Sequence, residues 1–145
     1  MNKKLLYISL GVLLIIIAII WNAVNEPGIK DLKGDFKEVA FVRNEQNSGP
    51  VIRVYAVSVE GEPWKEMEQF GNYMPHTKYG TTRVYFFPAN KPYPSTLVLG
   101  DENIAEHLKE NCLAVYEKDG MSQVHFQRYP YGNDHSNKFT FKRIL

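Results

Sequence analysis

The sequence predicts an α+β protein: an N-terminal transmembrane helix followed by one small domain with a mostly antiparallel sheet and about two short helices. Three observations predict this class. An almost unbroken apolar run opens the chain, two later segments have helical periodicity, and segments rich in β-branched and aromatic residues alternate with them without a strict βαβ repeat. The chain therefore divides into a short tail (1–4), a transmembrane helix (5–21), a linker (22–35) and a globular domain (36–145).

The apolar run from Leu5 to Trp21 is long enough to cross a bilayer as a helix. About 20 apolar residues span the hydrocarbon, where a helix satisfies its own backbone hydrogen bonds. A cleaved signal peptide is the alternative, but such a peptide has roughly 7–15 apolar residues and a small-residue cleavage site. Trp21 stands two positions before Ala23 and is too large for that site. We expect the run to be retained and to contact the lipid bilayer through residues 5–21.

Basic residues predict the orientation of this helix. Lys3 and Lys4 precede the run directly, whereas the first eight residues after it carry only the charge of Glu26. Basic residues close to a span tend to stay in the cytoplasm. We therefore expect a single-pass protein of the cytoplasmic (inner) membrane with its domain outside the cytoplasm, although the wider count is nearly even because three more lysines follow by residue 37.

Composition excludes some function classes. The 145 residues include 17 basic and 16 acidic side chains, and no basic stripe is present, so no nucleic-acid partner is expected. Aromatic residues make up 13% of the chain, which predicts a folded domain after the linker. The single cysteine, Cys112, excludes an internal disulfide framework and is expected to behave as a small buried hydrophobe.

Six segments are predicted to be strands because they are rich in β-branched and aromatic residues. They are residues 36–43, 50–59, 81–87, 113–118, 122–129 and 138–145. The second has apolar residues on both faces, which predicts a central strand covered on both sides. Asp119-Gly120 predicts a tight hairpin turn with positive φ angles.

Two segments are predicted to be helices. The first begins at Pro63, which suits the first helical turn, and ends by Met74 because a proline follows. The second covers residues 100–111 with Asp101 as its N-cap. Its buried stripe is expected to consist of Ile104, Ala105 and Leu108.

No sequence motif names a reaction, and we expect no catalytic residues, no metal site and no cofactor. His76 and His135 lie in polar loops, where bonding to the backbone or an ordinary surface turn explains them better than catalysis. His107 and Cys112 are five residues apart, which on an ideal helix is an angle of roughly 140° and disfavours a dyad.

Two loops rich in proline and tyrosine are the most suggestive candidates for a binding site. Prolines stiffen a loop, so binding costs less entropy, and tyrosines are enriched at protein interfaces. The alternative is that these tyrosines simply pack over the edge of the sheet. The predicted binding residues are Tyr93, Tyr129, Tyr131 and His135.

The expected function is that of a membrane-anchored, non-enzymatic protein-binding domain of the bacterial cell envelope, either an accessory subunit or a toxin-neutralising partner. A tether raises the effective concentration near the target. One alternative is a small envelope hydrolase or ligand-binding enzyme that uses His76 or His135. Another is a structural subunit whose span pairs with other helices, for which Ser9, Gly11 and Ala18 are the only small contact residues.

Overall fold

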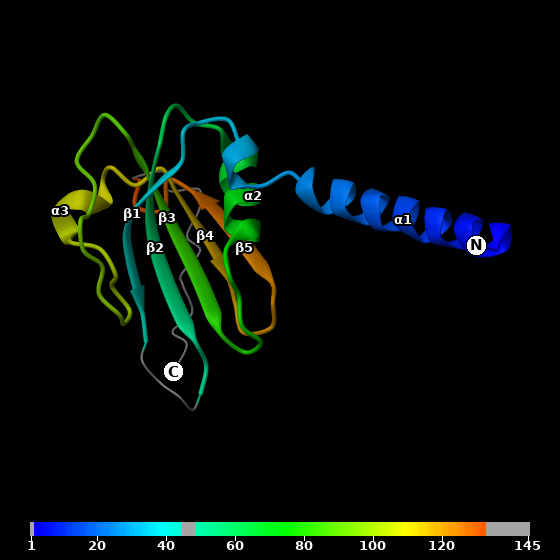
Figure 1. Ribbon diagram of the computed structural model, residues 1–145. Coiled ribbons are helices and arrows are strands. Elements are labelled where there is room, and N and C mark those ends of the chain that lie inside the picture. The colour runs from blue at the N-terminus through cyan, green and yellow to red at the C-terminus, as the bar shows by residue number, and fades with distance from the viewer. Residues whose placement is uncertain (1, 45–48, 133–145) are drawn as a thin grey trace. The chain divides into compact units, whose positions relative to one another are not determined.

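The computed structural model describes residues 2–44 and 49–132. It divides into two compact units, residues 1–31 and 32–145. Figure 1 shows the order of elements among the described residues, which confirms the predicted α+β class. The elements are α1 (Lys3–Val24), a 3₁₀ turn η1 (Ile29–Asp31), β1 (Lys37–Arg43), β2 (Ile52–Val59), α2 (Trp64–Tyr73), β3 (Thr81–Pro88), α3 (Glu106–Lys109), β4 (Ala114–Lys118) and β5 (Val124–Arg128).

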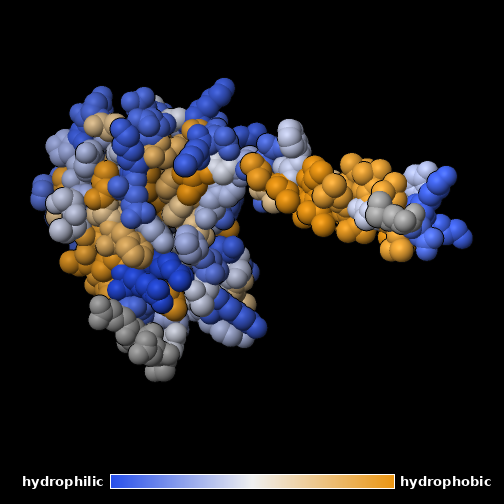
Figure 2. All heavy atoms as spheres, in the orientation of Figure 1, coloured by the Kyte–Doolittle hydropathy of each residue, from blue (hydrophilic) through white to orange (hydrophobic). Residues whose placement is uncertain are grey.

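The first unit is dominated by α1, a helix of 22 residues with no buried side chain. It is long and apolar enough to cross a membrane, since 22 residues rise about 33 Å against a hydrocarbon core of about 30 Å. Figure 2 shows the nearly continuous apolar surface along this helix. Within this helix the hydroxyl of Ser9 donates to the carbonyl of Leu6 at 2.9 Å, so its proton is already used.

The second unit is built on a five-stranded sheet in the order β1–β2–β3–β4–β5. β2 and β3 are parallel and are joined through α2, whereas the three other neighbouring pairs are antiparallel. The prediction of a mostly antiparallel sheet is therefore confirmed. Parallel neighbours cannot be joined by a tight turn, which explains why a helix separates β2 from β3.

One face of the sheet, here called the α2 face, packs against α2 (Figure 1). Met67 and Phe70 of the helix are buried there, as the helical spacing predicts. Gly71 permits the close approach, because a Cβ at this position would overlap the ring of Tyr116 on β4. The buried residues of this face are Tyr55, Val57, Val59, Met67, Phe70, Val84, Phe86, Leu113, Ala114 and Tyr116.

The opposite face, here called the α3 face, is covered by the long connection from β3 to β4 that includes α3. Val54 and Ala56 point to this face while their neighbours in β2 point to the α2 face, so the prediction of a strand covered on both sides is confirmed. The buried residues of the α3 face are Ala40, Val54, Ala56, Tyr85, Phe87, Leu97, Ile104, Leu108, Cys112 and Val115.

The predicted helix over residues 100–111 is wrong in extent. α3 has only four residues and begins after Ala105, so Asp101 caps no helix, and Ala105 is exposed while Ile104 and Leu108 are buried. The physical reason is Asn103, whose side-chain amide donates to two nearby backbone carbonyls and fixes a loop. Asparagine competes with helical hydrogen bonds in this way.

The predicted hairpin between β4 and β5 is present, but its turn differs from the prediction. The loop runs from Asp119 to Gln123, and the positive φ angle, 61°, belongs to Ser122 rather than to Asp119 or Gly120. The carboxylate of Asp119 accepts the backbone N–H groups of Met121 and Gln123, both at 2.9 Å. These two bonds favour the wider turn. The predicted strand 138–145 lies outside the described residues.

Candidate functional site

A buried polar network lies on the α3 face of the sheet. It consists of Arg83 on β3, Glu117 on β4, Tyr85 on β3 and Asn103 in the connection before α3. Arg83 Nε donates to Glu117 Oε2 at 2.6 Å, and Arg83 Nη1 donates to Asn103 Oδ1 at 2.7 Å. The Tyr85 hydroxyl donates to the same Asn103 oxygen at 2.9 Å. Because β3 and β4 pair Arg83 directly with Glu117, the sheet register itself holds the ion pair together.

The network fixes the loop that precedes α3. Asn103 Nδ2 donates to the carbonyls of Val98 at 2.8 Å and Gly100 at 3.2 Å, and the Val98 N–H donates back to the Asn103 carbonyl at 3.3 Å. Asn103 thus uses both side-chain donors and accepts two further bonds while it is almost fully buried. A fully satisfied buried amide of this kind specifies one loop conformation.

Tyr131 joins the α3 face next to this network. Burial raises the pKa of Tyr131, and the nearby Tyr85 is the next cause. The ammonium of Lys109 lies 5.5 Å from the centre of the Tyr131 ring. The residue is nevertheless 40% exposed, so Tyr131 lies beside Tyr85 and Lys109 and remains open to solvent.

Tyr93 also lies close to α3 in the described structure. The carbonyl of the preceding residue, Pro92, accepts a hydrogen bond from Asn111 Nδ2 at 3.1 Å, just after α3. The following residue, Pro94, is buried, while Tyr93 is 41% exposed. The loops that carry Tyr93 and Tyr131 therefore both attach to the α3 region.

Tyr129 is directed to the other side of the sheet. Its hydroxyl donates to the carboxylate of Glu62, and this bond raises the pKa of Tyr129. Its ring meets that of Trp64 on α2 edge to face, with centroids 5.3 Å apart, and the Arg128 guanidinium lies 4.9 Å from the Trp64 ring centre. Tyr129 and Tyr131 therefore do not form one patch. The fourth predicted binding residue, His135, lies outside the described residues.

His76 is held by a short chain of hydrogen bonds. Its Nδ1 lies 3.1 Å from Thr82 Oγ1, and Thr82 donates its own proton to the Pro75 carbonyl at 2.8 Å. Since the hydroxyl proton is committed, His76 Nδ1 carries the donated hydrogen and Nε2 keeps a lone pair, which is buried without a partner among the residues that the structure describes. Thr82 is too buried and too committed to act as a nucleophile.

The other histidines and Cys112 do not assemble a catalytic arrangement in the described part of the chain. His125 Nε2 pairs with Asp119 Oδ2 at 3.0 Å on an exposed hairpin, which stabilises the turn. His107 is exposed while Cys112 is buried, and burial raises the Cys112 pKa to about 12. No group of three metal-ligating side chains occurs among the residues described.

Sequence reasoning missed the polar network. Arg83 and Glu117 place charges of opposite sign in two strands rich in apolar residues, which is a weak local sign of a cross-strand pair. The register of β3 against β4 decides whether they meet, and Asn103 is more than a dozen residues from either of them.

Comparison with known proteins gives no match: no protein-family model, no curated protein and no solved structure is significantly similar to the chain. Any function of the chain therefore has to be inferred from the geometry of its described residues.

Proposed function

We propose that the chain is a membrane-anchored, non-enzymatic protein-binding domain of the bacterial cell envelope. In this proposal α1 is a retained single-pass anchor in the cytoplasmic membrane, and the sheet domain lies outside the cytoplasm. Two properties of α1 support the anchor: its length and its lack of any buried side chain. Lys3 and Lys4 at its start support an N-terminus that faces the cytoplasm. Trp21 near its end suits the opposite headgroup layer.

The observation that carries the binding proposal is the fixed exposure of two tyrosine rings around α3. Tyr131 lies beside Tyr85 and under the ammonium of Lys109, and the loop of Tyr93 is bonded through the neighbouring carbonyl, yet about two fifths of each residue is exposed. A ring that is already ordered loses little conformational entropy on binding. Tyrosine also supplies a large contact area with a polar tip. These are properties of residues that dominate protein interfaces.

Capture of partners from native membranes tests the proposal. The tagged full-length protein is crosslinked in cells, solubilised and purified beside the variants Tyr93→Ala and Tyr131→Ala. We expect each variant to reduce recovery of a specific protein by about tenfold or more, because truncating a central interface tyrosine costs about 2 kcal/mol. Tyr79→Ala is the matched control, since Tyr79 is exposed in the loop between α2 and β3. Equal recovery of every protein by all four chains contradicts the proposal.

A further inference from the structure

The loop before α3 exposes two adjacent aliphatic side chains. Val98 is 59% and Leu99 is 41% exposed, although Leu97 beside them is buried. Isolated apolar residues on a surface are ordinary. This pair differs because its backbone is clamped by Asn103, which Arg83 and Tyr85 hold in turn. The fold therefore keeps two apolar side chains in water on a backbone that its hydrogen bonds hold in one conformation.

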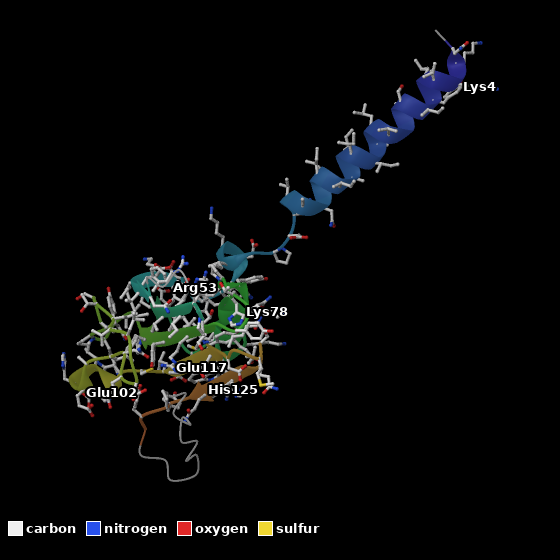
Figure 3. All side chains as sticks on the ribbon, turned by 90° about the horizontal axis from the view of Figure 1, so that it is seen from below. Lys4, Arg53, Lys78, Glu102, Glu117 and His125 are labelled. Carbon is white, nitrogen blue, oxygen red and sulfur yellow. The ribbon has the colours of Figure 1, made fainter. Side chains whose placement is uncertain are left out.

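Acidic side chains border this apolar pair. Asp101, Glu102, Glu106 and Glu110 are all exposed on the loop and on or beside α3. Lys109 pairs with Glu102 at 3.0 Å and with Glu106 at 2.6 Å. One ammonium group offsets only one of the four carboxylates, so residues 101–110 still carry a net negative charge. Figure 3 shows Glu102 beside α3, and Figure 2 shows apolar atoms at the surface on this side of the domain.

We propose that Val98 and Leu99 dock into an apolar pocket bordered by lysine or arginine side chains on a protein partner. The inference rests on the proposed protein-binding function and names the chemistry of the partner. Charge complementarity selects this occupant, because the carboxylates around the pair attract a cationic surface. The clamp on Asn103 means that the loop is ordered before the partner arrives, which lowers the entropic cost of binding.

The same charges disfavour two other occupants. An anionic lipid surface repels a loop with a net negative charge. A second copy of the chain in a two-fold arrangement would place the same acidic segment against itself. Juxtaposed like charges cost several kcal/mol at an interface. A cationic protein surface meets neither obstacle.

Site-specific photocrosslinking tests the inference on the full-length protein in native membranes. A diazirine amino acid replaces Val98, and the crosslinked partner peptide is identified after digestion. We expect an adduct with one protein, at a peptide in which apolar residues adjoin lysine or arginine. The double variant Asp101→Lys with Glu110→Lys should lower the yield at least fivefold, as should an increase in salt concentration. Neither residue is paired in the described part of the chain.

Two controls make this result specific. A diazirine at Met121, which is exposed on the β4–β5 hairpin, should give no adduct with the same protein. The charge reversal Glu68→Lys on the exposed side of α2 should leave the yield at position 98 unchanged. Circular dichroism melting of each variant verifies that the fold is retained.

The remaining outcomes overturn the inference. Adducts confined to lipid, to a second copy or to residues 133–145 of the same chain exclude the cationic pocket, and so does a yield that ignores both charge reversal and salt. If position 98 gives no partner adduct while Tyr93→Ala still abolishes capture, this inference fails and the proposed function stands. If neither experiment finds a partner, both this inference and the proposed function fail.

Discussion

His76 shows how the position of a single ring fixes its protonation state. Its Nδ1–H donates to Thr82, and its Nε2 is buried with no partner in the described part of the chain. Burial lowers the pKa of His76 below the ordinary value of 6.5, and the charges of Lys118 and Arg53 lower it further, while Asp119 opposes them. The folded domain therefore favours the neutral imidazole, since a proton on Nε2 would be desolvated beside two cations.

Acidification is accordingly expected to destabilise the domain through His76. The unfolded chain binds the proton at its ordinary pKa and the folded chain only at a lower pH, so the contribution is complete above pH 6.5 and is lost as the pH falls from there toward the folded pKa. His76→Asn keeps a donor for Thr82 but does not titrate. Unfolding followed by circular dichroism between pH 8 and 5 should show a larger loss for the wild type than for this variant.

Parallel stability profiles of the two chains would contradict that account. The Asp119 carboxylate does not affect the comparison of the wild type with His76→Asn between pH 8 and 5. The bond to His125 lowers the pKa of Asp119 below the ordinary value of 3.8. Its contribution is therefore lost only at still lower pH. Both chains also retain it equally.

At the scale of elements, the connection from β3 to β4 is the least regular part of the sheet domain and the most dependent on polar bonds. Asn103 ties it to the sheet through Arg83 and Tyr85, and closes the turn before α3 through the carbonyls of Val98 and Gly100. Buried polar groups of this kind are costly to leave unpaired. The conformation of the loop therefore depends on one amide group.

Asn103→Asp tests this dependence with almost no change in shape. The carboxylate keeps the acceptors for Arg83 and Tyr85 but lacks both donors, and it faces two carbonyl oxygens. We expect the free energy of unfolding to fall by about 1–3 kcal/mol. Hydrogen exchange of the Val98 amide, which donates to the Asn103 carbonyl, should accelerate.

The control for this variant is Asn90→Asp, an exposed position in the turn after β3, where we expect a change below about 0.5 kcal/mol. Unchanged protection of the Val98 amide in Asn103→Asp would show that the loop is held by its apolar contacts instead.

Regular elements of the domain could be predicted from local patterns, because alternation and helical spacing report which side of an element is buried. This holds for the five described strands and for α2, which begins after Pro63. α3 was overestimated because the hydrogen bonds of Asn103 depend on residues of β3 that are distant in sequence. The pairing of Arg83 with Glu117 likewise depends on strand register, which no local pattern contains.

The candidate tyrosines were found from composition, but their arrangement could not be predicted. Residues two apart on a strand share one face. Tyr129 and Tyr131 do not, because Tyr129 has a φ angle of 47° and turns the chain just after β5. Tyr129 consequently contacts Trp64 on the α2 face, whereas Tyr131 contacts Tyr85 on the α3 face.

At the scale of the whole molecule, the account depends on α1 as a tether. A helix of 22 residues without one buried side chain is unfavourable in water, since each exposed aliphatic side chain forgoes about 1.5–3 kcal/mol of burial. In the proposed function a bilayer would remove this cost, and the tether would raise the effective concentration of the sheet domain near a membrane-bound partner. In the proposed function the apolar helix is the membrane anchor, and the folded domain binds the partner.

Cysteine labelling in spheroplasts tests the membrane anchor and its orientation most directly. The only native thiol, Cys112, is buried with a pKa of about 12, so it should not react with a membrane-impermeant maleimide near neutral pH. Ser95→Cys introduces an exposed thiol in the domain, and Asn2→Cys introduces one before the helix. The account predicts that both chains sediment with membranes, that Ser95→Cys is labelled in intact spheroplasts, and that Asn2→Cys is labelled only after permeabilisation. A chain that stays in the high-speed supernatant with residue 2 attached, or the reverse pattern of labelling, would contradict it.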